Sequence, residues 1–196
     1  FSFHNTKTMS TGEGGMLLTN NFNLNKKFRE YRNLCFGSKK NRFNHYDIGW
    51  NYRFTNIQAT LGLSQLKRIN KIIKKKHIIG NYYYNHFKNI KNIILQPNSL
   101  SYCKNIYWVF GIVLKKNNKI KINKMIKKLA NKNIGTRPFF WPMHKQDVFK
   151  NKGYFKDLNF PNSEFIAANG FYLPSGLGLT LAELKFVKDT VVSILK

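Results

Sequence analysis

Residues 1–20 of the chain read FSFHNTKTMSTGEGGMLLTN. The lysine of this stretch, Lys7, lies among small polar residues, after an alternating Phe-Ser-Phe at residues 1–3 and before a glycine-rich turn. The short apolar run Gly14–Asn20 after the glycine pair predicts a strand that ends in a polar turn. Lys7 is therefore expected on a backbone hairpin with phenylalanine side chains nearby.

Two interpretations of Lys7 are open on the residues alone. Nearby phenylalanine rings would remove water from the amine and favour its neutral form, which is the form that attacks a carbonyl. In a chain this rich in lysine, a solvated surface charge is the alternative.

Charge is the strongest bias in the composition. Lysine and arginine total 34 against 8 acidic residues, a net charge of +26, and such an excess is typical of proteins that bind polyanions. The lysines are spread along the whole chain, and they accompany a heavy use of Asn, Ile and Phe, residues that share A- and T-rich codons. We therefore expect no specific nucleic-acid partner, and a basic nucleic-acid-binding module remains the alternative outside the enzymes.

Other features of the composition limit the class of protein. Cys35 and Cys103 lie far apart with no CxxC pair, so we expect reduced thiols in a cytoplasmic protein and no metal site. No apolar run approaches the roughly 20 residues of a membrane helix. The sequence opens on Phe1 without an initiator methionine, and we expect this to be an internal position of a longer protein.

The first half of the chain predicts a helix over Asn21–Arg32 and a loop over Gly37–Asn51. Thr55 or the asparagine after it can cap a helix N-terminus, and apolar residues follow at spacings of three to five. We expect one long amphipathic helix that runs to Phe87, with Gly80 as a candidate interruption. Such a helix joins two subdomains in many two-domain enzymes.

The second half alternates strands and helices that would build a small α/β domain. The expected elements are a buried strand over Tyr107–Leu114, a helix over Lys124–Lys132 capped by Asn123, a strand at Gly135–Phe140 and a helix over Leu181–Leu195 capped by Thr180.

Four segments together carry a resemblance to a known family. Residues 1–20 resemble the cofactor-lysine segment of the DegT/DnrJ/EryC1/StrS family of sugar aminotransferases, with its Ser-Phe pair, Lys and Gly-Glu-Gly-Gly turn. DIGWNYRFTNIQATLGLSQLKRI, residues 47–69, is similar to the second signature of that family. IGTRPFFWPMHKQDVF, residues 134–149, and FYLPSGLGLT, residues 171–180, resemble its perosamine synthetase branch.

This resemblance implies an α/β fold, namely the C-terminal part of a fold type I aminotransferase that depends on pyridoxal 5'-phosphate. Residues 1–54 would be the end of the large cofactor-binding domain, residues 55–90 the connecting helix, and residues 91–196 the small C-terminal α/β domain.

The resemblance also implies roles for three residues at the cofactor. Lys7 matches the lysine that binds pyridoxal phosphate and moves a proton during transamination. Ser2 matches a hydroxyl donor to the cofactor phosphate. Asn51 matches a residue that reaches the phosphate in the neighbouring subunit, so a homodimer with shared active sites is expected.

Three further residues are candidates for substrate binding. The Arg53 guanidinium suits the carboxylate of a glutamate donor or the cofactor, although a structural salt bridge is equally compatible. Arg137 and His144 lie in the perosamine-like segment, where a histidine near the sugar is expected. The alternative for His144 is a hydrogen-bonded residue that packs the domain junction.

The implied reaction is transamination of a nucleotide-linked 4-keto-6-deoxy sugar with glutamate as amino donor. The perosamine-like segment favours a GDP-linked sugar, and a dTDP- or UDP-linked sugar is the alternative. In this fold an aspartate that pairs with the pyridine nitrogen and an aromatic residue that stacks on the ring both precede the lysine. Residues 1–196 alone are therefore expected to be inactive or nearly so.

Overall fold

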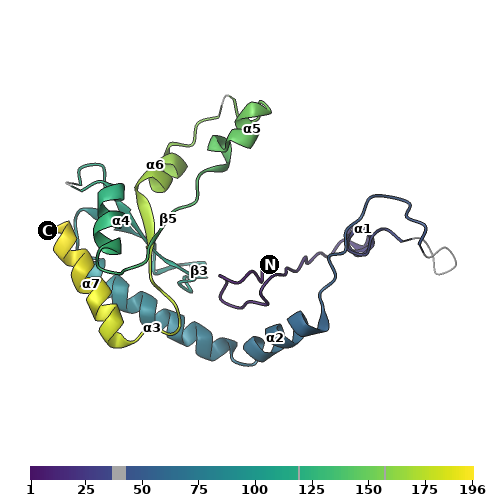
Figure 1. Ribbon diagram of the computed structural model, residues 1–196, viewed down its shortest axis with the longest axis horizontal. Helices are drawn as coiled ribbons and strands as arrows, with labels where there is room; N and C mark the ends of the chain where they lie inside the picture. Colours follow the sequence, from purple (N-terminus) through teal and green to yellow (C-terminus); the bar gives the residue numbers. More distant parts are fainter. Residues whose placement is uncertain (37–42, 119, 157) are drawn as a thin grey trace. The chain divides into compact units, whose positions relative to one another are not determined.

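The computed structural model describes residues 1–36, 43–118, 120–156 and 158–196 (Figure 1). They form two compact units, Phe1–Lys71 and Ile72–Lys196. The boundary between the units falls inside helix α3 (Ile69–Phe87). Residues 37–42 of the expected Gly37–Asn51 loop lie outside the described residues.

The first unit contains two complete helices with capped N-termini. In α1 (Phe22–Arg32) the Asn21 side chain accepts the Leu24 N–H at 3.1 Å. In α2 (Asn56–Leu66) Thr55 and Gln58 form a capping box, each side chain accepting the other's backbone N–H. Both helix starts are where the sequence predicts them, because Asn and Thr satisfy backbone donors that have no partner inside the helix.

The predicted strand Gly14–Asn20 is wrong. Only an isolated bridge between Ser2 and Gly15 forms, with the Met16 N–H bonded to the Phe1 carbonyl at 3.0 Å. A strand needs a paired neighbour, and no described segment pairs with the residues after Met16, so Leu17 and Leu18 lie exposed.

The predicted long helix is two helices. α2 ends at Leu66 and α3 begins at Ile69, and between them the Arg68 N–H bonds the Gln65 carbonyl at 2.9 Å in a tighter turn. Gly80 does not interrupt α3. A β-carbon at Gly80 would lie 2.1 Å from Tyr107 Cγ, so this glycine makes room for the tyrosine ring.

The second unit is built on a four-stranded antiparallel sheet of order β1-β4-β6-β5. Its strands are β1 (Ile93–Leu95), β4 (Phe110–Leu114), β5 (Arg137–Pro138) and β6 (Gly170–Leu173), and a separate hairpin pairs β2 (Ser99–Leu100) with β3 (Cys103–Lys104). Its remaining helices are α4 (Ile122–Ala130), the 3-10 turn η2 (Met143–Lys145), α5 (Asp147–Asn151), α6 (Pro161–Asn169) and α7 (Leu181–Leu195).

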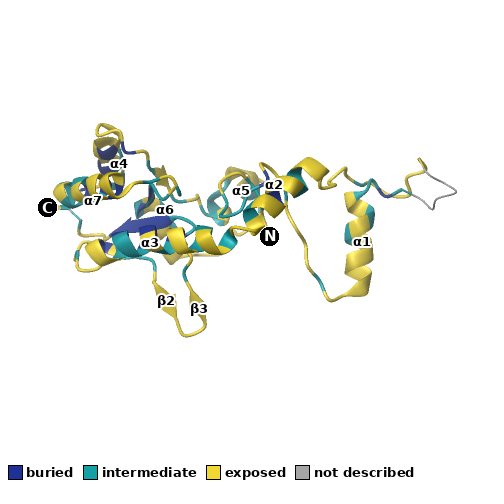
Figure 2. Ribbon diagram, turned by 90° about the horizontal axis from the view of Figure 1, so that it is seen from below, coloured by how far each residue is buried: buried dark blue, intermediate teal, exposed yellow. Residues whose placement is uncertain are grey.

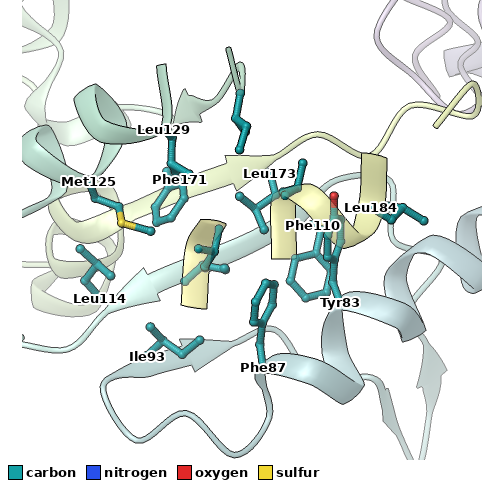
Figure 3. Packing of buried hydrophobic residues seen from close by; sticks show 14 of the residues in the cluster. Tyr83, Phe87, Ile93, Phe110, Leu114, Met125, Leu129, Phe171, Leu173 and Leu184 are labelled. Atoms are coloured by element: carbon teal, nitrogen blue, oxygen red, sulfur yellow. The ribbon is translucent and has the colours of Figure 1, made fainter. Parts of the chain in front are cut away.

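One face of this sheet carries the core. Phe110 and Ile112 of β4 and Phe171 of β6 are fully buried and belong to one cluster with side chains of α3, α4 and α7. The Phe110 ring contacts the Tyr83 and Phe87 rings, with centroids 5.1 and 6.2 Å apart (Figure 3). Because side chains alternate along a strand, the residues between these core positions face the other side of the sheet.

Most predicted elements of the second unit form, with shifted ends. The strand begins at Phe110 and not at Tyr107, whose φ of 51° does not continue an extended chain. α4 begins after Lys121, and Asn123 lies inside its first turn and does not cap it. Thr180 caps α7 as predicted, and its side chain accepts the Glu183 N–H at 3.2 Å.

Candidate active site

Lys7 lies in the turn of a backbone hairpin in the first unit. The Phe3 N–H bonds the Gly14 carbonyl at 2.8 Å, and the Thr11 N–H bonds the Phe3 carbonyl at 2.9 Å. Within the turn, the Lys7 N–H bonds the His4 carbonyl at 2.9 Å. These hydrogen bonds fix the backbone around Lys7, and the residue is half-buried, so part of it remains accessible.

Two glutamines of α2 hold this hairpin from one side. Gln65 accepts the Ser10 N–H at 3.0 Å and donates its amide to the Ser10 carbonyl. Gln58 donates to the Glu13 carbonyl at 3.0 Å. Residues seven apart lie on the same face of a helix, so both glutamines reach the hairpin. Neither glutamine was assigned a role from the sequence, although their spacing in residues 47–69 was the available signal.

The hairpin also packs closely against the Phe54 ring and against helix α2. A β-carbon at Gly14 would lie 2.4 Å from the Phe54 ring, and one at Gly62 of α2 would lie 3.2 Å from the Thr11 methyl. Thr11 is buried and donates its hydroxyl to the Glu13 carbonyl at 2.7 Å. The glycines therefore allow the hairpin, the Phe54 ring and the helix to approach closely.

The other predicted cofactor residues are exposed polar side chains. The Ser2 hydroxyl accepts the His4 N–H at 3.4 Å, close in sequence to the Lys7 turn. Asn51 pairs with Asn33 in an isolated bridge, and its side-chain oxygen accepts the Arg53 Nε–H at 2.9 Å. The structure thus joins Asn51 to Arg53 directly.

The donor chemistry of these residues fits pyridoxal phosphate. A hydroxyl at Ser2, an amide at Asn51 and a guanidinium at Arg53 are hydrogen-bond donors of the kinds that hold a phosphate, and Lys7 supplies an amine for the aldehyde. In the described part of the chain, no group of three or more His, Cys, Asp or Glu could hold a metal ion.

His144, in the second unit, is paired with an acid. Its Nε2 donates to Glu164 Oε1 at 2.9 Å, and Lys145 Nζ contacts the same oxygen at 3.0 Å. The hydrogen bond from His144 lowers the pKa of Glu164 most, and the bond from Lys145 lowers it further. Glu164 was not predicted from the sequence, because the apolar residues of α6 follow no helical period.

Next to His144 is an open pocket of about 750 Å³. It lies on the sheet face opposite the core, where Phe139 stacks on Tyr172 with ring centroids 4.5 Å apart. A β-carbon at Gly111 or Gly170 would lie 2.7 or 2.5 Å from the Phe139 ring, so these glycines make room for it.

Arg137 is exposed in β5 at the position opposite Tyr172. Directly opposed residues of antiparallel strands point to the same face, so Arg137 and the pocket share a face of the sheet. Arg137 and His144 therefore belong to one side of the second unit.

Solved structures match this chain along nearly its whole length. The aminotransferase PseC from Helicobacter pylori matches with a TM-score of 0.87 and 23% identity, covering 100% of this chain and 52% of that chain. The GDP-4-keto-6-deoxy-D-mannose-3-dehydratase from E. coli, with bound hydrated PLP, matches with a TM-score of 0.81 and 17% identity, covering 97% and 53%.

The fold is therefore that of the C-terminal half of type I pyridoxal-phosphate aminotransferases, as the sequence predicts. One of the two matches is a dehydratase, so this fold alone does not fix the reaction.

Sequence comparison gives the family. The profile of the DegT/DnrJ/EryC1/StrS aminotransferase family matches residues 1–192, and the chain belongs to that family, which depends on pyridoxal phosphate. GDP-perosamine synthase from Vibrio cholerae is 30% identical over 191 residues, 97% of this chain and 51% of that protein.

A second relative carries a different nucleotide in its name. The UDP-4-amino-4,6-dideoxy-N-acetyl-beta-L-altrosamine transaminase from Campylobacter jejuni is 26% identical, covering 100% of this chain and 52% of that protein. The chain spans about half the length of the curated relatives it matches. Among the described helices, none is long and apolar enough to cross a membrane.

Proposed function

We propose that the protein carrying this chain transfers an amino group from glutamate to a nucleotide-linked 4-keto-6-deoxy sugar, with pyridoxal phosphate as cofactor. The similarity to GDP-perosamine synthase supports a GDP-linked sugar. The similarity to the Campylobacter transaminase supports a UDP-linked sugar as the alternative. The product would enter synthesis of a surface polysaccharide.

We also propose a division of the chain into functional parts. Residues 1–54 would complete the large cofactor-binding domain, residues 55–90 would connect, and residues 91–196 would form the small domain. The break between α2 and α3 lies inside the proposed connection.

The observation that carries the proposal is the hairpin of Lys7, held by Gln58 and Gln65. When bound, the cofactor supplies an electron sink for the bonds at the reacting carbon. The Lys7 amine would bind it covalently until the amine of the substrate displaces it, and the released Lys7 Nζ would take and return the proton at the reacting carbon of the substrate. Fixing the backbone on both sides of the turn limits the space that Nζ samples, which favours one direction of proton transfer.

The remaining residues would bind and orient. Ser2 would donate to the cofactor phosphate, and Asn51 would donate to the phosphate in a neighbouring subunit of a homodimer. Arg53, oriented by its bond to Asn51, would receive the carboxylate of glutamate. Arg137 and His144 would hold the sugar nucleotide.

Borohydride trapping tests the role of Lys7. Pyridoxal phosphate is added to the full-length protein that carries this chain, sodium borohydride fixes the adduct, and peptide mapping by mass spectrometry locates it. We expect Lys7 to be labelled at cofactor concentrations that leave the other lysines unmodified. The variant Lys7→Arg should lose this label, whereas Lys27→Arg, an exposed lysine of α1, should keep it. Equal labelling of many lysines would contradict the proposal.

A further inference from the structure

The pocket of the second unit is walled by aromatic rings. Phe139 and Tyr172 form its floor as a stacked pair, and Phe160 lies against the ring of His144 with centroids 4.8 Å apart. Phe140 and Trp141, also in the lining, are 75% and 56% exposed. Flat apolar walls with few polar groups suit a flat, mostly apolar ligand group.

The His144 side chain in this pocket is held in place by a hydrogen bond to Glu164. The His144 side chain is only 9% exposed, and its Nε2 is occupied by the 2.9 Å bond to Glu164. Glu164 as a carboxylate only accepts, so His144 carries a proton on Nε2. In the described residues Nδ1 has no protein partner, which leaves it as the ring atom for a ligand.

We propose that this pocket binds the base of a nucleotide, and that Glu164 is a positioning residue that holds His144 to recognise the edge of that base. The proposal rests on the proposed function, because it places one part of the nucleotide-linked sugar. Stacking on aromatic rings is open to any base. With its proton on Nε2, His144 can accept a hydrogen bond at Nδ1, which suits a base with a ring N–H, such as guanine or uracil.

The surrounding charges fit the rest of a nucleotide. Arg137 shares the pocket face of the sheet, and Lys145, which also contacts Glu164 at 3.0 Å, follows His144 directly. Both cations suit a phosphate outside an apolar base pocket. A sugar ring would be a poorer occupant of the aromatic walls, because its hydroxyl groups need several hydrogen-bond partners.

Ligand binding to the chain itself tests this site without any catalytic step. Saturation-transfer NMR is recorded with GMP, UMP, CMP and ribose 5-phosphate as probes. We expect the base protons of GMP and UMP to receive more saturation than their ribose protons. Ribose 5-phosphate should bind at least about tenfold more weakly, because it lacks the stacking contribution. CMP, which has no ring N–H, should bind about threefold more weakly than UMP through loss of one hydrogen bond.

Two pairs of variants locate the binding. Phe160→Leu should weaken GMP binding about fivefold through lost stacking, whereas Phe186→Leu, an exposed phenylalanine of α7, should not change it. Glu164→Gln should reduce the preference for UMP over CMP, because Gln no longer fixes the proton on Nε2. Asp147→Asn removes the same charge from α5, where Asp147 contacts Lys150 and not His144, and should leave the preference intact.

Equal binding of ribose 5-phosphate and GMP would overturn the inference, and so would a Phe160→Leu variant that binds GMP as tightly as the unchanged chain. A third contrary result is a chain that self-associates in solution and a Phe160→Leu variant that loses this self-association but keeps GMP binding. The last would make this face an interface between copies of the chain. The trapping experiment at Lys7 is independent of these results. A labelled Lys7 without base binding rejects only the pocket assignment, and an unlabelled Lys7 rejects the proposed function itself.

Discussion

The two units of this chain differ in how many buried side chains stabilise each of them. The second unit has one continuous core, in which Tyr83, Phe110 and Phe171 are fully buried. In the described part of the first unit only Thr11, Cys35 and Gly62 are buried. Figure 2 shows the contrast: dark blue gathers around the sheet of the second unit, while α1 and α2 are mostly yellow.

The comparison shows which forces position each candidate site. The Lys7 hairpin depends on hydrogen bonds from Gln58 and Gln65, each of which stabilises by about 1 kcal/mol. The aromatic pocket is built on the back of a packed sheet, whose buried side chains contribute several times more. The Lys7 hairpin is therefore the more easily distorted of the two, and regions with few buried contacts open first.

Removing a buried ring from the core of the second unit should cost more stability than any other change considered below. Phe110→Ala should destabilise the second unit by about 3–5 kcal/mol, because it leaves a cavity between the Tyr83 and Phe87 rings. Urea unfolding followed by tryptophan fluorescence measures the loss. Phe186→Ala, on the exposed surface of α7, should change stability little.

The same variant tests whether the first unit is stable without an intact core in the second. If the first unit is held by its own hydrogen bonds, the Ser10 amide should stay protected from hydrogen exchange when Phe110→Ala loosens the core. Loss of protection at Ser10 together with the core would show that the first unit depends on the second.

Two helix glycines should respond differently to alanine. Gly80→Ala places a methyl group against the Tyr107 ring, and we expect a cost of about 1–3 kcal/mol from overpacking. Gly62→Ala meets only the Thr11 methyl at 3.2 Å, and the better helix propensity of alanine should offset that contact to within about 1 kcal/mol. Melting temperatures of the two variants give the comparison, and an equal loss in both would contradict it.

Gln65→Ala should act on the hairpin alone. It removes both bonds to Ser10 and should cost about 1 kcal/mol locally, seen as faster hydrogen exchange at the Ser10 amide and slower borohydride trapping at Lys7. Ser64→Ala, the preceding residue of α2, serves as the control. If the rate of trapping is unchanged in Gln65→Ala, the order of the hairpin does not control the reactivity of Lys7.

How far the sequence predicts these features depends on the range of the interactions that form them. Helix starts at Asn21, Thr55 and Thr180 follow from local capping chemistry and were predictable. The need for a glycine at position 80 inside α3 was not predictable, because it comes from the ring of Tyr107, which lies 27 residues later in the chain. The strand expected at Gly14–Asn20 failed because a strand requires a partner that local sequence cannot supply.

The candidate sites show the same limit. Lys7 was found through its motif, and Gln58 and Gln65 could have been found through their spacing. The pairing of His144 with Glu164 spans two short helical segments without apolar periodicity. Nothing in the sequence of residues 134–149 indicates that the partner of His144 lies 20 residues later.

The smallest expected effect compares the two capping boxes under acid. In the first unit the box of α2 pairs Thr55 with neutral Gln58, and in the second the box of α7 pairs Thr180 with Glu183. Backbone and hydroxyl bonds from Thr180 lower the pKa of Glu183. A carboxyl with a lowered pKa stabilises the fold above its unfolded pKa of about 4.3, and that contribution is lost as the pH falls through the folded value.

Acid should therefore loosen the start of α7 and leave the start of α2 unchanged. Protection factors of the Glu183 and Gln58 amides, corrected for the intrinsic exchange rate and followed from pH 6 down to about pH 3, should fall only for Glu183. In the Glu183→Gln variant the α7 box becomes like that of α2, and its pH dependence should disappear. A parallel fall at both helix starts would mean that acid acts on the whole chain, whose high positive charge increases as its few carboxylates become protonated, and not on this one cap.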